Sequence, residues 1–228
     1  MDTLLVRILF PTTAVGLALL FESRGLGLFN AIALPVWVGV VASVVILDVA
    51  IYLQHVLFHA VPALWRLHRM HHADLEFDVS TGLRFHPIEI LLSMIIKFTV
   101  VAALGAPALA VLIFEVVLNA TSMFNHGNVR VSPRLDRTLR WVVVTPDMHR
   151  VHHSVLSRET NSNFGFNLPW WDRLFGTYRA QPVAGHANMT IGIEQFRDPR
   201  EHRLDRMLLQ PFREEAGRYP LGHRDDEQ

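Results

Sequence analysis

The sequence predicts an all-α fold, an integral membrane bundle of about four transmembrane helices that carries a cytoplasmic, histidine-rich helical cap. Three observations predict this class. Half of the 228 residues are hydrophobic, with a mean hydropathy of +0.25. Four long apolar stretches lie within the first 125 positions. Ten of the 13 histidines lie between residues 55 and 153, and eight of these form three tight clusters.

The first two apolar stretches predict the first two spans. Crossing the hydrocarbon core takes about 20 residues. The stretch at about 3–21 is broken only by Arg7 and Pro11. A signal peptide is the alternative for it, although no small-residue cleavage site follows cleanly. The stretch at about 29–53 is the longest and carries one acid, Asp48, near its end.

Two further stretches, at about 88–104 and 106–124, predict the third and fourth spans, with a tight hairpin at Gly105-Ala106-Pro107 between them. Lys97 and Glu115 lie inside these stretches, and ionisable residues in spans are functional candidates. A soluble protein with very apolar core helices is the alternative. Four such segments are hard to bury in so short a chain.

The two halves of the chain differ in charge. Residues 1–125 hold 6 basic and 8 acidic residues, and residues 126–228 hold 15 and 13. With four spans, both termini and the 54–87 loop share one side of the membrane. The positive-inside rule puts that Arg-rich side in the cytoplasm. We expect one membrane-bound domain over 1–208, with its cap from 54–87 and 125–180, and a polar tail over 209–228.

Composition excludes several classes of function. The 21 basic and 21 acidic residues cancel, which leaves no electrostatic footprint for nucleic acid. Cysteine is absent, which excludes disulfides, thiolate zinc sites, cysteine-ligated iron–sulfur clusters and thiol nucleophiles. Histidine is therefore the residue type that points to chemistry.

The clustered histidines have the spacing of metal ligands. They are His55, His59, His68, His71, His72, His149, His152 and His153. Residues three or four apart share one face of a helix. Adjacent residues diverge by about 100°, so neighbours such as His71 and His72 can each face a different metal. The same holds for His152 and His153, and together these pairs predict a two-metal centre.

Neutral imidazole suits iron, zinc, copper and nickel. His86 at the start of the third span and His126 at the end of the fourth complete a set of ten candidates, although either could be an ordinary polar residue at a helix end. The clusters hold no carboxylate, which favours all-nitrogen sites. His186, His202 and His223 lie outside the clusters and are interpreted as surface residues. The polar residues that could orient the imidazoles, or act only as caps and turns, are Asp48, Asp74, Asp78, Asn125, Asn128, Asp147, Asn161 and Asn163.

These motifs resemble the fatty acid hydroxylase/sterol desaturase superfamily. The resemblance covers roughly residues 45–180. Besides the three clusters it is carried by the segments Arg84-Phe-His-Pro-Ile-Glu89, Asn125-His-Gly-Asn128, Asn163-Phe-Gly165 and Trp171-Asp-Arg-Leu-Phe-Gly-Thr-Tyr178. It implies a membrane-bound non-haem di-iron oxygenase that hydroxylates or desaturates a lipid C–H bond. It implies two Fe²⁺ ions, held by the eight clustered histidines with His86 and His126, and no further catalytic residue.

The resemblance also implies the partners: a lipid from the bilayer, O₂ and an electron donor. Zinc could occupy the same ligands in purified material. Sterol, fatty acyl, ether lipid and carotenoid substrates all fit the same metal core. The donor is expected to be a separate protein, because the chain lacks a Gly-x-Gly-x-x-Gly nucleotide motif. A bacterial inner membrane is expected rather than the endoplasmic reticulum, since no retention tail is present.

Two other functions remain open from the sequence. A zinc-dependent membrane hydrolase would activate water and need neither O₂ nor electrons. A non-enzymatic metal-binding or transport protein would place its polar residues near the middle of the membrane. The histidine clusters instead lie at or beyond the ends of the predicted spans.

Overall fold

A computed structural model describes residues 2–213 and 216–221, with side chains from residue 13 onward. Over this range every regular secondary-structure element is a helix, and the one β-type pairing is an isolated bridge between Ser154 and Ile191. The all-α prediction is confirmed. The helices in chain order are α1 (Asp2–Ser23), α2 (Leu28–Ala31), α3 (Val36–Ala60), α4 (Pro62–His72), η1 (Thr81–Leu83), α5 (Pro87–Leu104), α6 (Ala108–Asn125), α7 (Pro133–Leu139), α8 (Pro146–His152), α9 (Ser157–Thr160), α10 (Trp170–Leu174), η2 (Pro199–His202), α11 (Leu204–Met207) and η3 (Gln210–Phe212).

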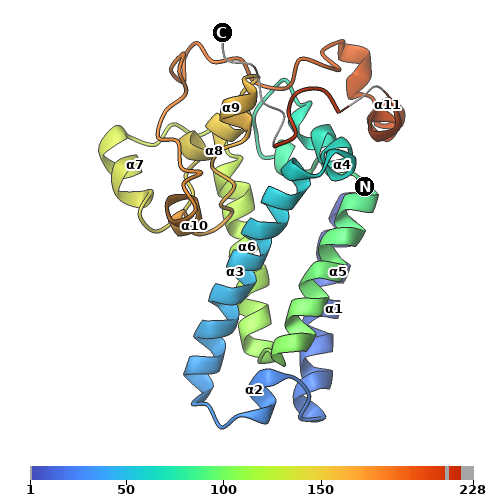
Figure 1. The fold of residues 1–228 in the computed structure, drawn as a ribbon, viewed down its shortest axis with the longest axis vertical. Helices are drawn as coiled ribbons and strands as arrows, with labels where there is room; N and C mark the ends of the chain where they lie inside the picture. The colour runs from blue at the N-terminus through green and yellow to red at the C-terminus, as the bar shows by residue number, and fades with distance from the viewer. Residues whose placement is uncertain (1, 214–215, 222–228) are drawn as a thin grey trace.

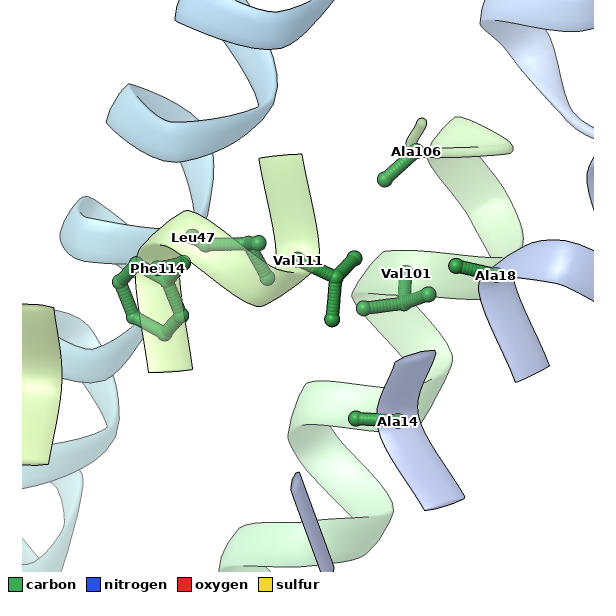
Figure 2. Packing of buried hydrophobic residues seen from close by; sticks show 7 residues of the cluster. All are labelled: Ala14, Ala18, Leu47, Val101, Ala106, Val111 and Phe114. Atoms are coloured by element: carbon green, nitrogen blue, oxygen red, sulfur yellow. The ribbon is translucent and has the colours of Figure 1, made fainter. Parts of the chain in front are cut away.

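The four long helices α1, α3, α5 and α6 pack side by side as an elongated bundle, with α2 at its lower end and the shorter helices from α7 onward toward its upper end (Figure 1). Ala14 and Ala18 of α1 are fully buried and lie near Val101 of α5 (Figure 2). Small residues such as these let helix backbones approach closely. Phe114 and Leu47 extend the same core between α6 and α3. The packing therefore joins all four helices along one apolar core.

Three of these helices are long and apolar enough to cross a membrane. They are α3 with 25 residues and α5 and α6 with 18 each. Only 22–33% of their most apolar windows is buried, so most of this surface faces outward. An apolar surface of that extent indicates contact with lipid. The stretch predicted as the first span forms α1, whose side chains at 2–12 lie outside the described part, and a fourth span stays a prediction.

The predicted hairpin between the third and fourth spans is present. α5 ends at Leu104, Gly105 adopts a left-handed conformation with φ 59°, and α6 begins at Ala108. A Cβ atom at Gly105 would lie 2.4 Å from the carbonyl oxygen of Leu26. Glycine is needed here for both its backbone angle and its size.

An ion pair between Lys97 and Glu115 joins α5 to α6 inside the bundle. Both side chains are almost fully buried, with 8% and 3% of the residue exposed. Removing one partner of a buried pair leaves an uncompensated charge, whereas removing both does not. The pair is therefore a strong constraint on how these two helices meet.

Replacing Glu115 with glutamine is expected to lower the free energy of unfolding by about 3 kcal/mol, because Lys97 would keep an unpaired buried charge. The double variant K97M/E115M is expected to recover most of that loss. Thermal unfolding in detergent, followed by circular dichroism, compares the two. An equal loss in both variants would contradict this interpretation of the pair.

Above the bundle the chain folds into a compact cap. α4 follows α3 after a break at Val61, whose extended backbone precedes Pro62 at the first position of the helix. The described residues of the expected polar tail pack back onto this cap. Arg69 donates to the carbonyl oxygen of Gln210 at 2.6 Å, and Tyr219 stacks on Trp65 with ring centroids 5.4 Å apart. Residues 214–215 and 222–228 of that tail lie outside the described part.

One segment of the expected cap lies beside the bundle instead of above it. The indole of Trp171 donates to Asp48 at 2.7 Å, and the Phe175 ring stacks on Tyr52 with centroids 5.4 Å apart. Asp48 and Tyr52 belong to the middle of α3, so α10 packs against the apolar part of that helix (Figure 1). Asp48 thus anchors α10, and among the described residues it has no hydrogen bond to the histidines that follow it.

Candidate metal centre

Helix ends bring nine histidines together at the junction of bundle and cap. α3 supplies His55 and His59 near its last turn, and α6 ends with His126 at its C-cap. Thr145 caps the start of α8: its hydroxyl accepts from the Met148 amide, an arrangement typical of helix starts. The other members come from the two repeated clusters: His68, His71 and His72 from α4, and His149, His152 and His153 from α8 and its C-cap.

The nine imidazoles divide into two groups, each with its candidate ligand nitrogens within 4.8 Å of one another. The five-histidine group is His55, His59, His68, His72 and His152. The four-histidine group is His71, His126, His149 and His153. No other residue with side chain described joins either group. Every member is buried, with at most 6% of the residue exposed.

Adjacent histidines fall into different groups. His72 belongs to the five-histidine group and His71 to the four-histidine group, and His152 and His153 divide in the same way. The angular divergence of consecutive helical residues predicts this separation. Two neighbouring sites are thus built on the same two short helices, α4 and α8.

Most of the rings are held by a hydrogen bond from Nδ1, which leaves Nε2 directed at the group. His55 donates to the carbonyl oxygen of Phe164 at 2.8 Å, and His71 donates to that of Thr81 at 2.9 Å. Fixing one ring nitrogen in this way sets the tautomer and orientation of a metal ligand. The other four such contacts are His59 to Asn161 at 3.1 Å, His68 to Glu89 at 2.6 Å, His126 to Ser122 at 2.8 Å and His152 to Ser162 at 2.8 Å.

In each group, the Nε2 atoms of two imidazoles face each other with their lone pairs. Carbonyl oxygens only accept, so His71 and His126 carry their proton on Nδ1, and their Nε2 atoms lie 3.3 Å apart as two acceptors. Nδ1 of His55 donates to a carbonyl oxygen and Nδ1 of His68 to a carboxylate oxygen of Glu89, so their Nε2 atoms stand in the same relation at 3.1 Å. A cation between such acceptors resolves the conflict. The donor set therefore fits a metal ion in both groups.

Burial keeps these imidazoles in the neutral, ligand-competent form. For the five members on α4 and α8 with resolved shifts, desolvation holds the pKa well below the usual 6.5, and neighbouring imidazoles lower it further. These are His71, His72, His149, His152 and His153. Ring nitrogens with no hydrogen-bond partner among the described residues include Nε2 of His59, Nε2 of His152 and both nitrogens of His153. Such buried orphans are expected to have a partner, and a metal would be one.

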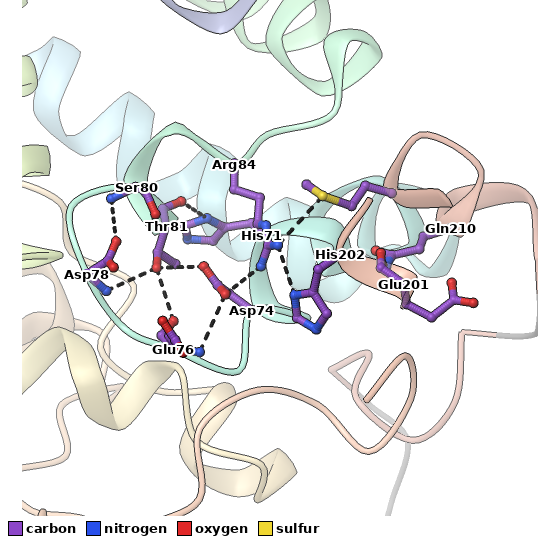
Figure 3. A network of polar contacts seen from close by, with 11 residues as sticks. His71, Asp74, Glu76, Asp78, Ser80, Thr81, Arg84, Glu201, His202 and Gln210 are labelled. Atoms are coloured by element: carbon purple, nitrogen blue, oxygen red, sulfur yellow. Dashed lines mark hydrogen bonds and ion pairs between the residues drawn. The ribbon is translucent and has the colours of Figure 1, made fainter. Parts of the chain in front are cut away.

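Thr81 shows how a loop supports a ligand. Its carbonyl oxygen accepts from His71, while its hydroxyl donates to Asp74 at 2.8 Å (Figure 3). Asp74 in turn pairs with Arg84 at 2.5 Å. Asp74, which precedes Thr81 in the chain, and Arg84, which follows it, therefore hold the loop in the conformation that orients His71.

Of the flanking polar residues singled out in the sequence, Asn161 contacts a histidine of the groups directly. Asp78 accepts from the amide of Ser80 in a turn, and Asp147 pairs with Arg150. Glu89, which lies in the Arg84–Glu89 motif, also contacts a grouped histidine, His68. Its spacing from Pro87 places it in the first turn of α5, which is the signal that could have identified it.

The remaining histidines have other surroundings. His86 lies outside both groups; its Nδ1 accepts from the Ile88 amide at 3.2 Å and its Nε2 contacts the carbonyl oxygen of Leu208 at 3.3 Å. It therefore caps α5. His202 contacts Arg84 at 3.0 Å, and His186 lines a separate cavity. His223 lies outside the described residues.

A cavity of about 180 Å³ adjoins the five-histidine group between α3, α5 and α6. His55, His68 and Glu89 line one part of it, and Lys97 and Glu115 line another. The walls between are largely apolar: Ile51, Phe58, Ile90, Met94, Leu118 and Phe166. Such a cavity suits a hydrocarbon chain next to the histidines.

The fold and the site together define a class: an all-helical protein with apolar, membrane-length helices and two adjoining histidine groups able to hold metal ions. The particular family follows from comparison with known proteins. The chain belongs to the fatty acid hydroxylase family, whose model matches residues 40–177. The matched region contains all nine grouped histidines.

Named relatives share this region. Ornithine lipid hydroxylase OlsE of Rhizobium tropici is 35% identical over 159 residues, which cover 69% of this chain and 46% of the relative. Alkylglycerol monooxygenases of Xenopus tropicalis and Homo sapiens are 27% and 26% identical, covering 58% and 65% of this chain but 28% and 32% of their own length. The chain thus spans less than half of the curated relatives it matches. No solved structure matches it significantly.

Proposed function

We propose that this protein is a membrane-bound non-haem di-iron oxygenase that hydroxylates or desaturates a C–H bond of a membrane lipid. The observation that carries the proposal is the pair of buried all-imidazole groups, with lone pairs converging in each, beside an apolar cavity among membrane-length helices. Relatives named as an ornithine lipid hydroxylase and as alkylglycerol monooxygenases support a lipid substrate.

The proposed ligands are the nine grouped histidines, which leaves His86 out of the set predicted from the sequence. Two iron ions would supply O₂ activation and the oxidising power for the C–H bond. The chain's own residues have simpler tasks. Backbone carbonyls hold the imidazoles in one tautomer, Glu89 fixes His68, and the cavity places a lipid methylene next to His55 and His68 away from water.

The topology of the proposed enzyme follows the sequence prediction. α1 would cross the membrane in addition to α3, α5 and α6, which would put both termini and the histidines on the Arg-rich cytoplasmic side. Electrons would come from a separate donor protein. We propose a bacterial inner membrane as its location.

The function is tested with the purified full-length chain in nanodiscs of native lipids, loaded with ferrous iron and supplied with a chemical reductant. We expect labelled oxygen from O₂ in a product lipid, or a new double bond formed only when O₂ is present. A matched sample loaded with zinc is the control and is expected to give neither product.

Two results would overturn the proposal. Product formed by the zinc-loaded sample under strict anoxia would favour the membrane hydrolase. Metal uptake into sealed vesicles, with no lipid product in any sample, would favour a transport protein.

A further inference from the structure

A second cavity, of about 760 Å³, lies among α7, α8, α10 and residues 180–187. It shares no lining residue with the histidine groups. Five arginines line it, against two acids, so its lining carries a net charge of +3 with histidine neutral. The arginines are Arg130, Arg137, Arg140, Arg150 and Arg173, and the acids are Asp136 and Asp147.

The acids of this cavity are already occupied. Asp136 pairs with Arg140 at 2.6 Å and also accepts from the hydroxyl of Thr145 at 2.6 Å. Asp147 pairs with Arg150 at 2.9 Å. Among the described residues no carboxylate forms an ion pair with the other three arginines of the cavity. The positive charge is therefore left for a ligand.

Buried donors without partners point the same way. Arg140 is 4% exposed and uses Nε for Asp136 and Nη1 for the carbonyl oxygen of Ala180, but its Nη2 has no hydrogen-bond partner among the described residues. Nε of Arg173 and both ring nitrogens of His186 are buried and unpartnered as well. Guanidinium N–H groups that have no partner are suited to bind the oxygens of phosphate or carboxylate.

The depth of α10 indicates where this anion comes from. A Cβ atom at Gly39 of α3 would lie 3.6 Å from Pro107, so Gly39 is level with the start of α6. At 1.5 Å per helical residue, Asp48 and Tyr52 lie about 14 and 20 Å further along the bundle. A hydrocarbon core of about 30 Å reaches past both. The segment 170–175, which contacts these two residues, is therefore at membrane depth on the cap side.

The surface around α10 has the composition of a membrane interface. Trp141, Leu174 and Phe175 are exposed, at 60%, 68% and 53%. Arg173 lies over the Trp141 ring at 4.3 Å and over the Tyr178 ring at 4.0 Å, so a cation and two aromatics meet at the cavity wall. Aromatic anchors next to basic side chains are typical of the level of lipid headgroups.

We propose that this cavity binds the phosphate of an anionic membrane lipid, at a site separate from the histidine groups. Phosphate is the shared chemistry of a lipid headgroup and of a soluble phosphate. The apolar residues around the cavity and the depth of α10 favour the lipid. An acidic soluble protein would meet the same apolar surface and bilayer, which oppose its approach.

The test is native mass spectrometry of the full-length chain released from micelles that contain equal amounts of phosphatidylglycerol and phosphatidylcholine. We expect retention of phosphatidylglycerol to exceed that of phosphatidylcholine, and R137Q to reduce it about five-fold, the effect expected of one arginine near a membrane surface. R137Q/R140Q is expected to abolish the preference. R134Q is the matched control, because Arg134 lies on the same helix α7 but does not line the cavity, and it is expected to retain the lipid fully.

Arg140 has structural contacts, so R137Q, at an exposed position, decides the outcome if the double variant does not fold. Equal retention by R137Q, R134Q and the unchanged chain would overturn the proposal. The proposal would also be overturned if inorganic phosphate stabilised the protein against unfolding while phosphatidylglycerol was retained no better than phosphatidylcholine. That result would assign the cavity to a soluble anion. Unchanged lipid retention, with donor-supported turnover lost in R137Q alone, would assign it to a protein partner and overturn the proposal as well.

Discussion

Replacing His153 with alanine is expected to abolish lipid oxidation and to lower bound metal from about two ions per chain to about one. His153 belongs to the four-histidine group, and both of its ring nitrogens are buried without a hydrogen-bond partner among the described residues. Three imidazoles would remain in that group. The five-histidine group keeps all its members, so one ion is expected to stay bound. Metal counting by mass spectrometry, alongside the activity assay, measures both effects.

The neighbouring variant H152A provides the matched comparison. It removes a ligand from the five-histidine group, where four imidazoles remain, and is expected to lose activity with a smaller loss of metal. H86N serves as the control, because asparagine can still cap α5 and His86 belongs to neither group. It is expected to keep both metal and activity. Full activity in H153A, or loss of both ions in H86N, would contradict the proposed ligand set.

Acid is expected to unfold the metal-free protein at a pH where the metal-loaded protein survives. The pKa values of His71, His72, His149, His152 and His153 are held well below 6.5 in the folded state by burial. Below about pH 6.5 the unfolded chain takes up protons that the folded chain does not, so stability falls as pH falls. Each such group costs about 1.4 kcal/mol per pH unit below that point.

Thermal unfolding of chelator-treated protein between pH 8 and pH 5 measures this effect. Between pH 8 and pH 7 the melting temperature is expected to change little through these groups, and below pH 6.5 it is expected to fall steeply. Bound metal competes with protons for the same nitrogens and is expected to move the fall to lower pH. A metal-free protein whose melting temperature is flat from pH 7 to pH 5 would contradict the buried, neutral state of the histidines.

The helices were largely predictable because apolar runs and breakers mark them. The hairpin at Gly105 and the end of α6 near Phe124 follow directly from the sequence. The second span differs: the apolar stretch predicts it at 29–53, whereas α3 runs from Val36 to Ala60. Pro35 precedes its start, and nothing breaks the helix before Val61 and Pro62. The apolar stretch ends at about residue 53, where polar residues begin, whereas the helix continues through His55 and His59.

The two-group partition was predictable, while the orienting contacts were not. Consecutive histidines on a helix must diverge, so His71 and His72 could be assigned to different groups from spacing alone. The carbonyl oxygen that fixes His55 belongs to Phe164, 109 residues later in the chain. No local pattern contains such a contact. His86 illustrates the converse, since a motif position next to Pro87 can be a cap as readily as a ligand.

The division of adjacent histidines between the groups has a consequence for how metal would be taken up. One peptide bond joins His71 to His72, and another joins His152 to His153, so α4 and α8 each hold a ligand of both sites rigidly together. Ordering α4 and α8 around one ion would also pre-order the ligands that these two helices supply to the neighbouring site. Under the proposed function, the second ion binds more tightly than the first for this reason, and loading is cooperative. Titration with limiting iron would then yield mostly empty and fully loaded chains, with few that hold a single ion.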